Sequence, residues 1–162
     1  MASTLLLIRH GIAEDPGPGR RDADRALTPE GWSKTRAAMR GLVRRGHIPT
    51  RGLTSPYRRA VETMTCLQEA AGRAFAVEAW EGLAPHGDPG AADLWLGSLM
   101  AELDGSEVVA LASHQPFLGD LVLRLTGRGV EVKKASCTVV RWEEGLWRFE
   151  RHFTPAELRE GA

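Results

Sequence analysis

The sequence predicts a three-layer α/β/α sandwich, with a mainly parallel sheet closed at one edge by a C-terminal antiparallel hairpin. Three observations predict this fold. Apolar runs of strand length alternate with segments of helical length, short connections join them, and the last two apolar segments meet at a tight turn. Alternating strands and helices form parallel sheets with helices on both faces, whereas strands joined by a turn pair antiparallel.

The first two elements follow from local pattern. Residues 4–9 read TLLLIR, a continuous apolar run that predicts a strand covered on both faces. Residues 14–26 are rich in Pro, Gly and Asp and have no period, so they predict a loop. Thr28 is a good N-cap residue and Pro29 suits the first helical position. A helix is therefore expected at about 29–45.

The later elements repeat this alternation. Residues 51–55 predict a second short strand, and Ser55-Pro56 is expected to open a helix that stops near Gly72. The remaining expectations are a strand at 75–80, a loop at 81–92, helices at 91–103 and 115–127, a strand at 107–113, and two strands within 135–153 that turn at Glu144-Gly145.

Composition limits the class of protein. A chain of 162 residues with 43% apolar and 26% charged residues predicts one domain spanning 1–162. The formal net charge is zero and no basic run occurs, so neither a nucleic acid nor an anionic membrane is an expected partner. Cys66 and Cys137 form no Cys-x-x-Cys, and no run is long enough to span a membrane. We expect a cytoplasmic protein and, although the sequence does not decide oligomeric state, a monomer.

Polar residues gather where three predicted strands end. Ligands of such sheets bind beyond the carboxyl ends of the strands, where helices also begin. Arginine forks match the geometry of a phosphate and keep their charge. The sequence therefore predicts a crevice for a small anion with several oxygens. The segments that reach it are Arg9-His10-Gly11, Ser55-Pro56-Tyr57-Arg58-Arg59 and Ser113-His114.

Four motifs occur in order along roughly residues 4–126. They are Arg9-His10-Gly11, Leu27-Thr28-Pro29-Glu30-Gly31, Ser55-Pro56-Tyr57-Arg58-Arg59-Ala60 with Thr63, and Ser113-His114. Together they resemble the histidine phosphatase superfamily, and the small size and the stretch EGLAPHGDP are most similar to its phosphohistidine phosphatases of the SixA type. The resemblance implies a phosphoglycerate-mutase-like fold and a metal-independent phosphatase with no cofactor.

The resemblance also implies roles for individual residues. His10 would be the nucleophile that forms a phosphohistidine intermediate, because a neutral imidazole can attack phosphorus. Arg9 and Arg59 would hold the oxygens of the transferred group, and His114 would stabilise them as a cation or as an N–H donor. The family pattern places the functional arginine at 59 rather than 58. Implied substrate-binding residues are Gly11, Arg25 and Ser113.

The leaving group separates the subfamilies. Phosphate esters benefit from a carboxylic acid, and Pro85 stands where the mutases of this superfamily carry a glutamate. A phosphohistidine leaves as an imidazole, which takes a proton near neutral pH. This departure favours a phosphorylated protein over a small phosphate ester as substrate. Candidate proton donors nearby are Glu81, His86 and Asp88.

Other interpretations stay open from the sequence. A small-molecule phosphomonoesterase of the same superfamily is one alternative, and a non-catalytic phosphate-binding module is another. Arg9 could instead pair with Asp22 or Asp24, and Arg59 could be an exposed helix residue that pairs with Glu62 or Glu69.

Overall fold

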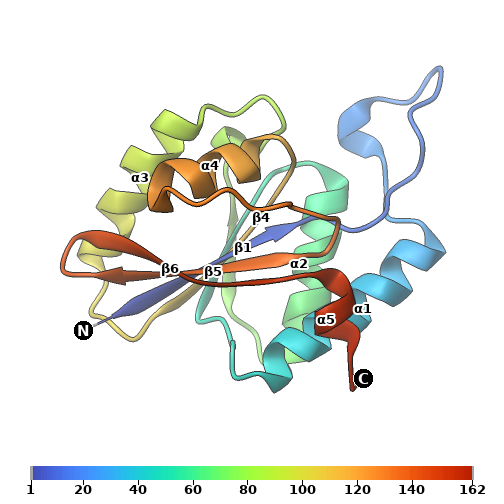
Figure 1. Cartoon of the computed structure of the whole chain (residues 1–162). Coiled ribbons are helices and arrows are strands. Elements are labelled where there is room, and N and C mark those ends of the chain that lie inside the picture. Colours follow the sequence, from blue (N-terminus) through green and yellow to red (C-terminus); the bar gives the residue numbers. More distant parts are fainter. Residues whose placement is uncertain (1, 162) are drawn as a thin grey trace.

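The computed structural model describes residues 2–161, which form one six-stranded sheet flanked by helices (Figure 1). The strand order is β3-β2-β4-β1-β5-β6. The first four strands are parallel, β5 is antiparallel to β1, and β6 is antiparallel to β5. The predicted fold class is confirmed. The strands are β1 (Ser3–Arg9), β2 (Arg51–Thr54), β3 (Ala76–Ala79), β4 (Val108–Ser113), β5 (Cys137–Glu143) and β6 (Leu146–Phe153).

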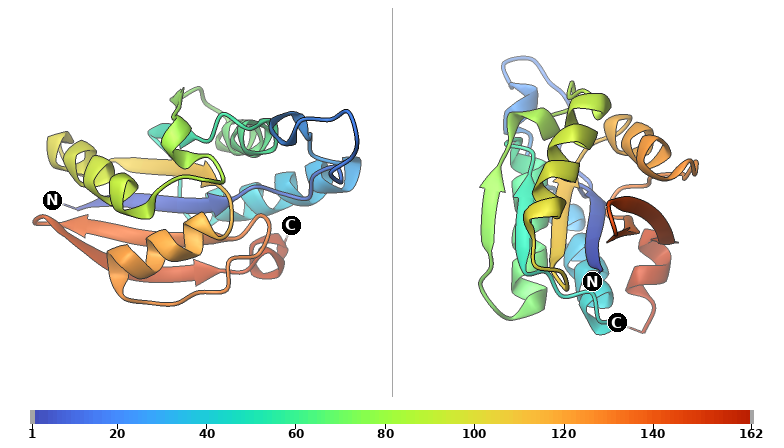
Figure 2. Two further views of the ribbon diagram at one scale, coloured as in Figure 1. Left: turned by 90° about the horizontal axis from the view of Figure 1, so that it is seen from above. Right: turned by 90° about the vertical axis from the view of Figure 1, so that its left-hand side faces the viewer.

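Helices cover both faces of the sheet (Figure 2). One apolar cluster joins α1, α2 and α5 to the first face, and a second cluster joins α3 and α4 to the other. None of the described helices has the length and apolar character that crossing a membrane requires. The helices are α1 (Pro29–Arg44), α2 (Arg58–Ala71), α3 (Pro89–Glu102), α4 (Phe117–Thr126) and α5 (Pro155–Arg159), with short 3-10 helices η1 (Asp22–Asp24) and η2 (Glu81–Leu83).

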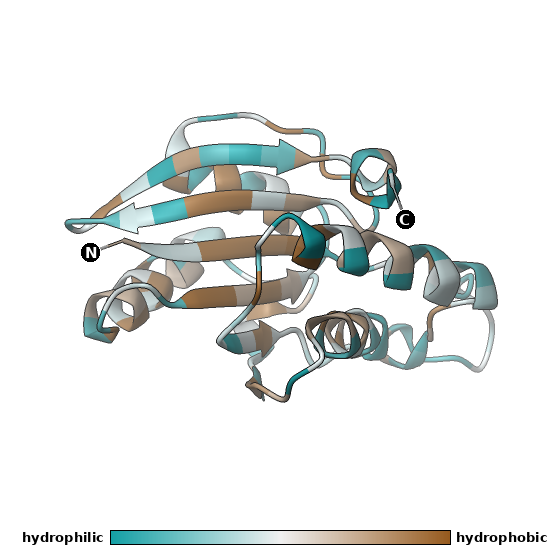
Figure 3. Cartoon of the chain, turned by 90° about the horizontal axis from the view of Figure 1, so that it is seen from below, coloured by the Kyte–Doolittle hydropathy of each residue, from teal (hydrophilic) through white to brown (hydrophobic). Residues whose placement is uncertain are grey.

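Strand β1 lies inside the sheet and is buried on both faces. Successive side chains of a strand point to opposite faces, so Leu5 and Leu7 pack with α3 and α4 while Leu6 and Ile8 pack with α1 and α2. The apolar residues of the central strands appear as continuous brown segments in Figure 3, whereas the edge strand β6 alternates between apolar and polar residues. The continuous apolar run of β1 is therefore the pattern of a central parallel strand.

The topology brings the carboxyl ends of three strands to one edge. Arg9 is in register with Ser113 at the ends of β1 and β4. Thr54 at the end of β2 pairs with Ala112 of the same central strand. Ser55 continues this edge through its N–H, which donates to the carbonyl oxygen of Ala112 at 2.9 Å. The three polar segments predicted to converge therefore start from adjacent strands.

The structure corrects several predicted boundaries. Helix α2 begins at Arg58 instead of Ser55-Pro56, because the Ser55 side chain bonds to the N–H of Tyr57 and to His114. Helix α3 begins at Pro89, two residues before the predicted start, behind an Asp88 N-cap. Helix α5 was not predicted, nor were the two 3-10 helices.

Candidate active site

His10 leaves the end of β1 with its side chain 7% exposed. Its backbone N–H donates to the carbonyl of Ser113, which ties the residue to β4. In the ring, Nδ1 lies 2.7 Å from the carbonyl oxygen of Gly11. A carbonyl can only accept, so Nδ1 carries the proton and Nε2 keeps its lone pair. The structure thus fixes the tautomer that leaves Nε2 free to act as a nucleophile.

Arg59 faces that lone pair from the first turn of α2. Its Nε donates to His10 Nε2 at 3.3 Å, and the residue is only 5% exposed. The neighbouring Arg58 is exposed and forms a pair with Glu62 one turn along the helix. The interpretation of Arg59 as an exposed residue paired with Glu62 or Glu69 is therefore wrong. The structure places Arg59, not Arg58, beside His10.

The surroundings of His10 keep its ring neutral. Burial is the main cause that lowers the pKa of His10 to about 3, and the charges of Arg59, Arg9 and Lys134 lower it further against the opposing Gly11 hydrogen bond. Removing water and adding cations both disfavour an imidazolium. At neutral pH the ring therefore holds an available lone pair.

His114 follows β4 and lies against His10, with ring centroids 5.1 Å apart. Its Nε2 lies 2.7 Å from Ser55 Oγ, which also accepts the N–H of Tyr57. No other acceptor for the Ser55 hydroxyl proton is found among the described residues, so this proton goes to His114 Nε2. Nδ1 then carries the ring proton, and it is buried without a partner. Burial, followed by His10 and Arg59, lowers the pKa of His114 to about 3, so the ring is a neutral N–H donor.

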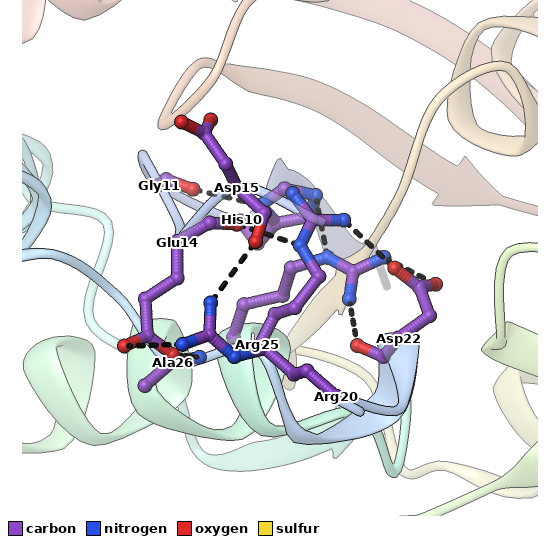
Figure 4. A network of polar contacts seen from close by, with 9 residues as sticks. His10, Gly11, Glu14, Asp15, Arg20, Asp22, Arg25 and Ala26 are labelled. Atoms are coloured by element: carbon purple, nitrogen blue, oxygen red, sulfur yellow. Dashed lines mark hydrogen bonds and ion pairs between the residues drawn. The ribbon is translucent and has the colours of Figure 1, made fainter. Parts of the chain in front are cut away.

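A carboxylate that the sequence did not single out for the site pairs with Arg59. This carboxylate belongs to Asp22 in η1. Arg59 Nη2 donates to Asp22 Oδ2 at 3.2 Å, and Arg59 Nη1 donates to the backbone carbonyl of Asp22 at 2.8 Å. Arg25 holds the other carboxylate oxygen at 2.7 Å and donates to the carbonyl of Glu14 (Figure 4). The hydrogen bond from Arg25 and the charge of Arg59 lower the pKa of Asp22. Arg25 therefore positions Asp22, which is ionised.

Arg9 reaches the site edge without a carboxylate partner. Its Nη1 donates to the carbonyl of Val132 at 3.0 Å, while its Nε is buried and unpartnered. Burial and the charge of Arg59 lower its pKa. Asp22 pairs with Arg25 and Arg59, and Asp24 pairs with Arg21, so the alternative that Arg9 binds either aspartate is wrong.

Two implied substrate-binding residues make internal contacts. The N–H of Gly11 donates to Thr63 Oγ1 at 3.1 Å, and a Cβ on Gly11 would lie 2.0 Å from Thr35 Oγ1. Gly11 is thus the residue that lets α1 approach the chain after β1. The hydroxyl of Ser113 is fully buried and donates to the carbonyl of Leu83 at 2.6 Å, which links β4 to η2.

The candidate proton donors bond to other groups than the reacting cluster in the described structure. Glu81 and His86 are both largely exposed and face each other at 3.8 Å. Asp88 caps α3 by accepting the N–H of Gly90. Among residues 2–161, none of the three has a hydrogen bond or ion pair with His10, Arg59 or His114.

The arrangement suits chemistry on an oxyanion. It offers a neutral nitrogen nucleophile, two guanidinium groups and an unpartnered ring N–H within one buried cluster. In the described part of the chain, no group of three or more His, Cys, Asp or Glu side chains is arranged to hold a metal ion.

Comparison with known sequences agrees with this geometry. The family model "Histidine phosphatase superfamily (branch 1)" matches residues 5–85. The phosphohistidine phosphatase SixA homolog of Haemophilus influenzae is 32% identical over 133 residues, which cover 76% of this chain and 77% of that protein. An uncharacterised protein of Picosynechococcus sp. is 34% identical over 152 residues, covering 91% and 89%.

Solved structures show the same similarity. The protein histidine phosphatase SixA complexed with tungstate matches with a TM-score of 0.86 and 27% identity, covering 96% of this chain and 99% of that one. The phosphoglycerate mutase of Bacillus anthracis shares the fold with a TM-score of 0.79 at 16% identity, covering 99% and 96%.

Proposed function

The chain belongs to the histidine phosphatase superfamily and is a phosphatase, and from this premise we propose that it hydrolyses phosphohistidine in a protein. The proposed reaction needs no metal or other cofactor and passes through a phosphohistidine intermediate on His10. One observation carries this proposal. The Nδ1–H of His10 is held by the Gly11 carbonyl, so a neutral Nε2 lone pair faces Arg59.

The proposed reaction has two steps. His10 Nε2 attacks phosphorus in line, a new N–P bond forms, and the N–P bond to the substrate imidazole breaks. Arg9, Arg59 and the His114 N–H stabilise the charge on the transferred oxygens. Water then attacks the phosphorus on His10, which releases inorganic phosphate and restores the lone pair.

The leaving group supports phosphohistidine over an ester. An alkoxide leaves poorly without an acid, whereas a leaving imidazole takes a proton from water near neutral pH. Among residues 2–161, Glu81, His86 and Asp88 form no hydrogen bond or ion pair with His10, Arg59 or His114, whereas Asp22 pairs with Arg59. Because its neighbours lower the pKa of Asp22, this group is a poor proton donor.

The direct test is phosphate release by the purified protein with chelator present. The substrates are a histidine-phosphorylated protein and a panel of phosphate monoesters, each with the wild-type protein and His10→Ala. We expect fast release from phosphohistidine that the variant loses. Faster phosphate release from one monoester would indicate a phosphatase of small-molecule esters. No release from any substrate would indicate a non-catalytic phosphate-binding module. Unchanged turnover by His10→Ala would remove the proposed nucleophile.

The setting of this activity belongs to the same proposal. We propose one catalytic domain over residues 1–162 that acts as a monomer in the cytoplasm. Its partner would be a phosphorylated protein of a signal transduction system, with neither a nucleic acid nor a membrane involved. The formal net charge of zero supports the exclusion of polyanionic partners.

A further inference from the structure

A pocket of about 430 Å³ lies beside the candidate active site. It is bounded by the chain after β1, the first half of α1, the segment before β5, and α5. The chain contains only three lysines, and all of them line this pocket together with two arginines. No aspartate or glutamate lines it. The five cations are Arg9, Lys34, Lys133, Lys134 and Arg159.

These charges are poorly compensated. Among residues 2–161, no carboxylate lies within ion-pair distance of Lys133, Lys134 or Arg159, and only Lys34 has a partner, Glu30, at 3.1 Å. Elsewhere most surface arginines pair with a carboxylate, although the chain as a whole is neutral. Gathering like charges costs free energy unless an anion joins them. The pocket therefore has the electrostatics of an anion site.

The wall of the pocket also holds unused polar groups. Thr35 lines it, and the Thr35 Oγ1 is fully buried with no hydrogen-bond partner. The Nε of Arg9, another lining residue, is buried and unpartnered as well. Buried polar atoms are normally satisfied, so these two side chains keep unused hydrogen-bonding capacity beside the pocket.

The pocket borders the chain segment that carries His10. Arg9 and Gly11 line it, and they flank His10 in the chain. Lys134 is close enough for its charge to lower the pKa of His10. An anion held here would thus lie next to the chain segment that carries His10, on the same side of the molecule as Arg9 and Gly11.

We propose that this pocket is a second anion site, which binds a carboxylate or phosphate carried by the substrate whose phosphoryl group is transferred to His10. The inference rests on the proposed function, under which the anion is an acidic side chain near the phosphohistidine. Lysine suits this role, because its flexible ammonium group binds as a point charge without a fixed geometry. A second phosphate on a small substrate is the other source of the same chemistry.

Five substrates separate the outcomes. Phosphoimidazole carries no second anion. A histidine-phosphorylated peptide with neighbouring Glu residues is compared with the same peptide carrying Gln, and a bisphosphate ester is compared with the matching monophosphate. We expect a KM about fivefold to tenfold lower for the Glu peptide than for the Gln peptide, an advantage that falls with added salt.

The matched variants remove two charges each. Lys133→Gln/Arg159→Gln changes the pocket and leaves Lys134 in place. Arg40→Gln/Arg148→Gln removes two exposed cations for which residues 2–161 offer no hydrogen-bond or ion-pair partner. We expect Lys133→Gln/Arg159→Gln to abolish the lower KM of the Glu peptide while kcat and phosphoimidazole turnover stay unchanged. We expect Arg40→Gln/Arg148→Gln to keep the lower KM of the Glu peptide. The proposal of a second anion site would be refuted if the wild type has the same KM for the Glu and Gln peptides, or if the two double variants change this KM difference equally.

The same assay keeps the two proposals apart. If phosphoimidazole is hydrolysed but the Glu peptide is not preferred over the Gln peptide, the second anion site is refuted and the proposed function is supported. The opposite result is also informative. If no phosphoramidate is hydrolysed, the proposed function is wrong. If a bisphosphate is then preferred over its monophosphate, and Lys133→Gln/Arg159→Gln removes that preference, the anion site still stands.

Discussion

At the scale of single residues, the candidate active site holds two neutral histidines among permanent cations. The pKa values of His10 and His114 are both lowered to about 3, first by burial and then by nearby charges. An unfolded histidine takes its proton near its ordinary pKa of about 6.5. Below that pH the two histidines bind protons in the unfolded chain but stay neutral in the folded chain. The free energy of unfolding therefore decreases as pH falls from about 6.5 towards 3.

Replacing His10 should weaken this pH dependence. Between pH 7 and 4.5, His10→Asn is expected to lose about 2 kcal/mol less unfolding free energy than the wild type, because one neutral histidine no longer opposes protonation. Urea unfolding at the two pH values measures the difference. His86→Asn, at a side chain that is 68% exposed, is the control and should behave as the wild type. An equal loss in His10→Asn and wild type would contradict the lowered pKa.

Arg59 and Arg58 form a matched pair for the guanidinium role. Arg59→Lys keeps the charge but removes the fork that contacts His10 and Asp22, so kcat should fall about 10²- to 10³-fold. Arg58→Lys, at an exposed pair with Glu62, should stay within about twofold of the wild type. Steady-state phosphate release measures both, and similar losses in the two variants would refute the assignment of Arg59.

At the scale of elements, the segment between β1 and α1 supplies the carboxylate that pairs with Arg59. This segment projects from the sheet in Figure 1 and carries η1. Within it, Arg25 bonds to both the carbonyl of Glu14 and the carboxylate of Asp22 (Figure 4), and Asp22 in turn pairs with Arg59. Under the proposed function, a bound phosphoryl group and the carboxylate of Asp22 would compete for the same guanidinium.

Removing that carboxylate should strengthen binding of inorganic phosphate. Asp22→Asn is expected to lower the inhibition constant of phosphate up to about fivefold, the equivalent of one partly exposed ion pair. Asp24→Asn breaks only the exposed pair with Arg21 and is the control. Weaker inhibition by phosphate in Asp22→Asn than in the control would show that Asp22 does not compete.

The contact between α1 and the chain after β1 requires a glycine at position 11, because a side chain there would clash with Thr35. Gly11→Ala would place a Cβ 2.0 Å from Thr35 Oγ1, and we expect a loss of about 1–3 kcal/mol of unfolding free energy. Adding Thr35→Ala should recover part of that loss, because the clashing oxygen is gone. Gly17→Ala, with no atom within 4 Å, is the matched control. Thermal or urea unfolding measures all three, and a Gly11→Ala variant as stable as Gly17→Ala would be inconsistent with this packing.

Not every element could be predicted equally well. The sequence around α5 does carry a readable signal, a capping box in which Thr154 and Glu157 bond to each other's backbone N–H groups. The position of Asp22 had no such signal, because η1 lies in a stretch without any period. Ser55-Pro56 resembles a helix start, yet tertiary contacts to His114 keep Ser55 outside α2.

At the scale of the whole molecule, the strand order explains why the sequence predicts much of the site. Arg9, His10 and His114 follow apolar central strands, and β1 and β4 are neighbours in the sheet. Parallel strands place such residues at one edge whatever the loops do. The orientation of each side chain depends on long-range partners such as Val132 for Arg9, which no local pattern encodes.

The most direct test of the central claim is to locate the phosphoryl group on the enzyme during turnover. The protein is mixed with a phosphohistidine protein, quenched in alkali, which preserves a phosphoramidate, and digested for mass spectrometry. We expect a phosphoryl group on His10 and none in the His10→Ala variant. Turnover with no phosphoryl group on His10, or with one on another residue, would contradict His10 as the nucleophile.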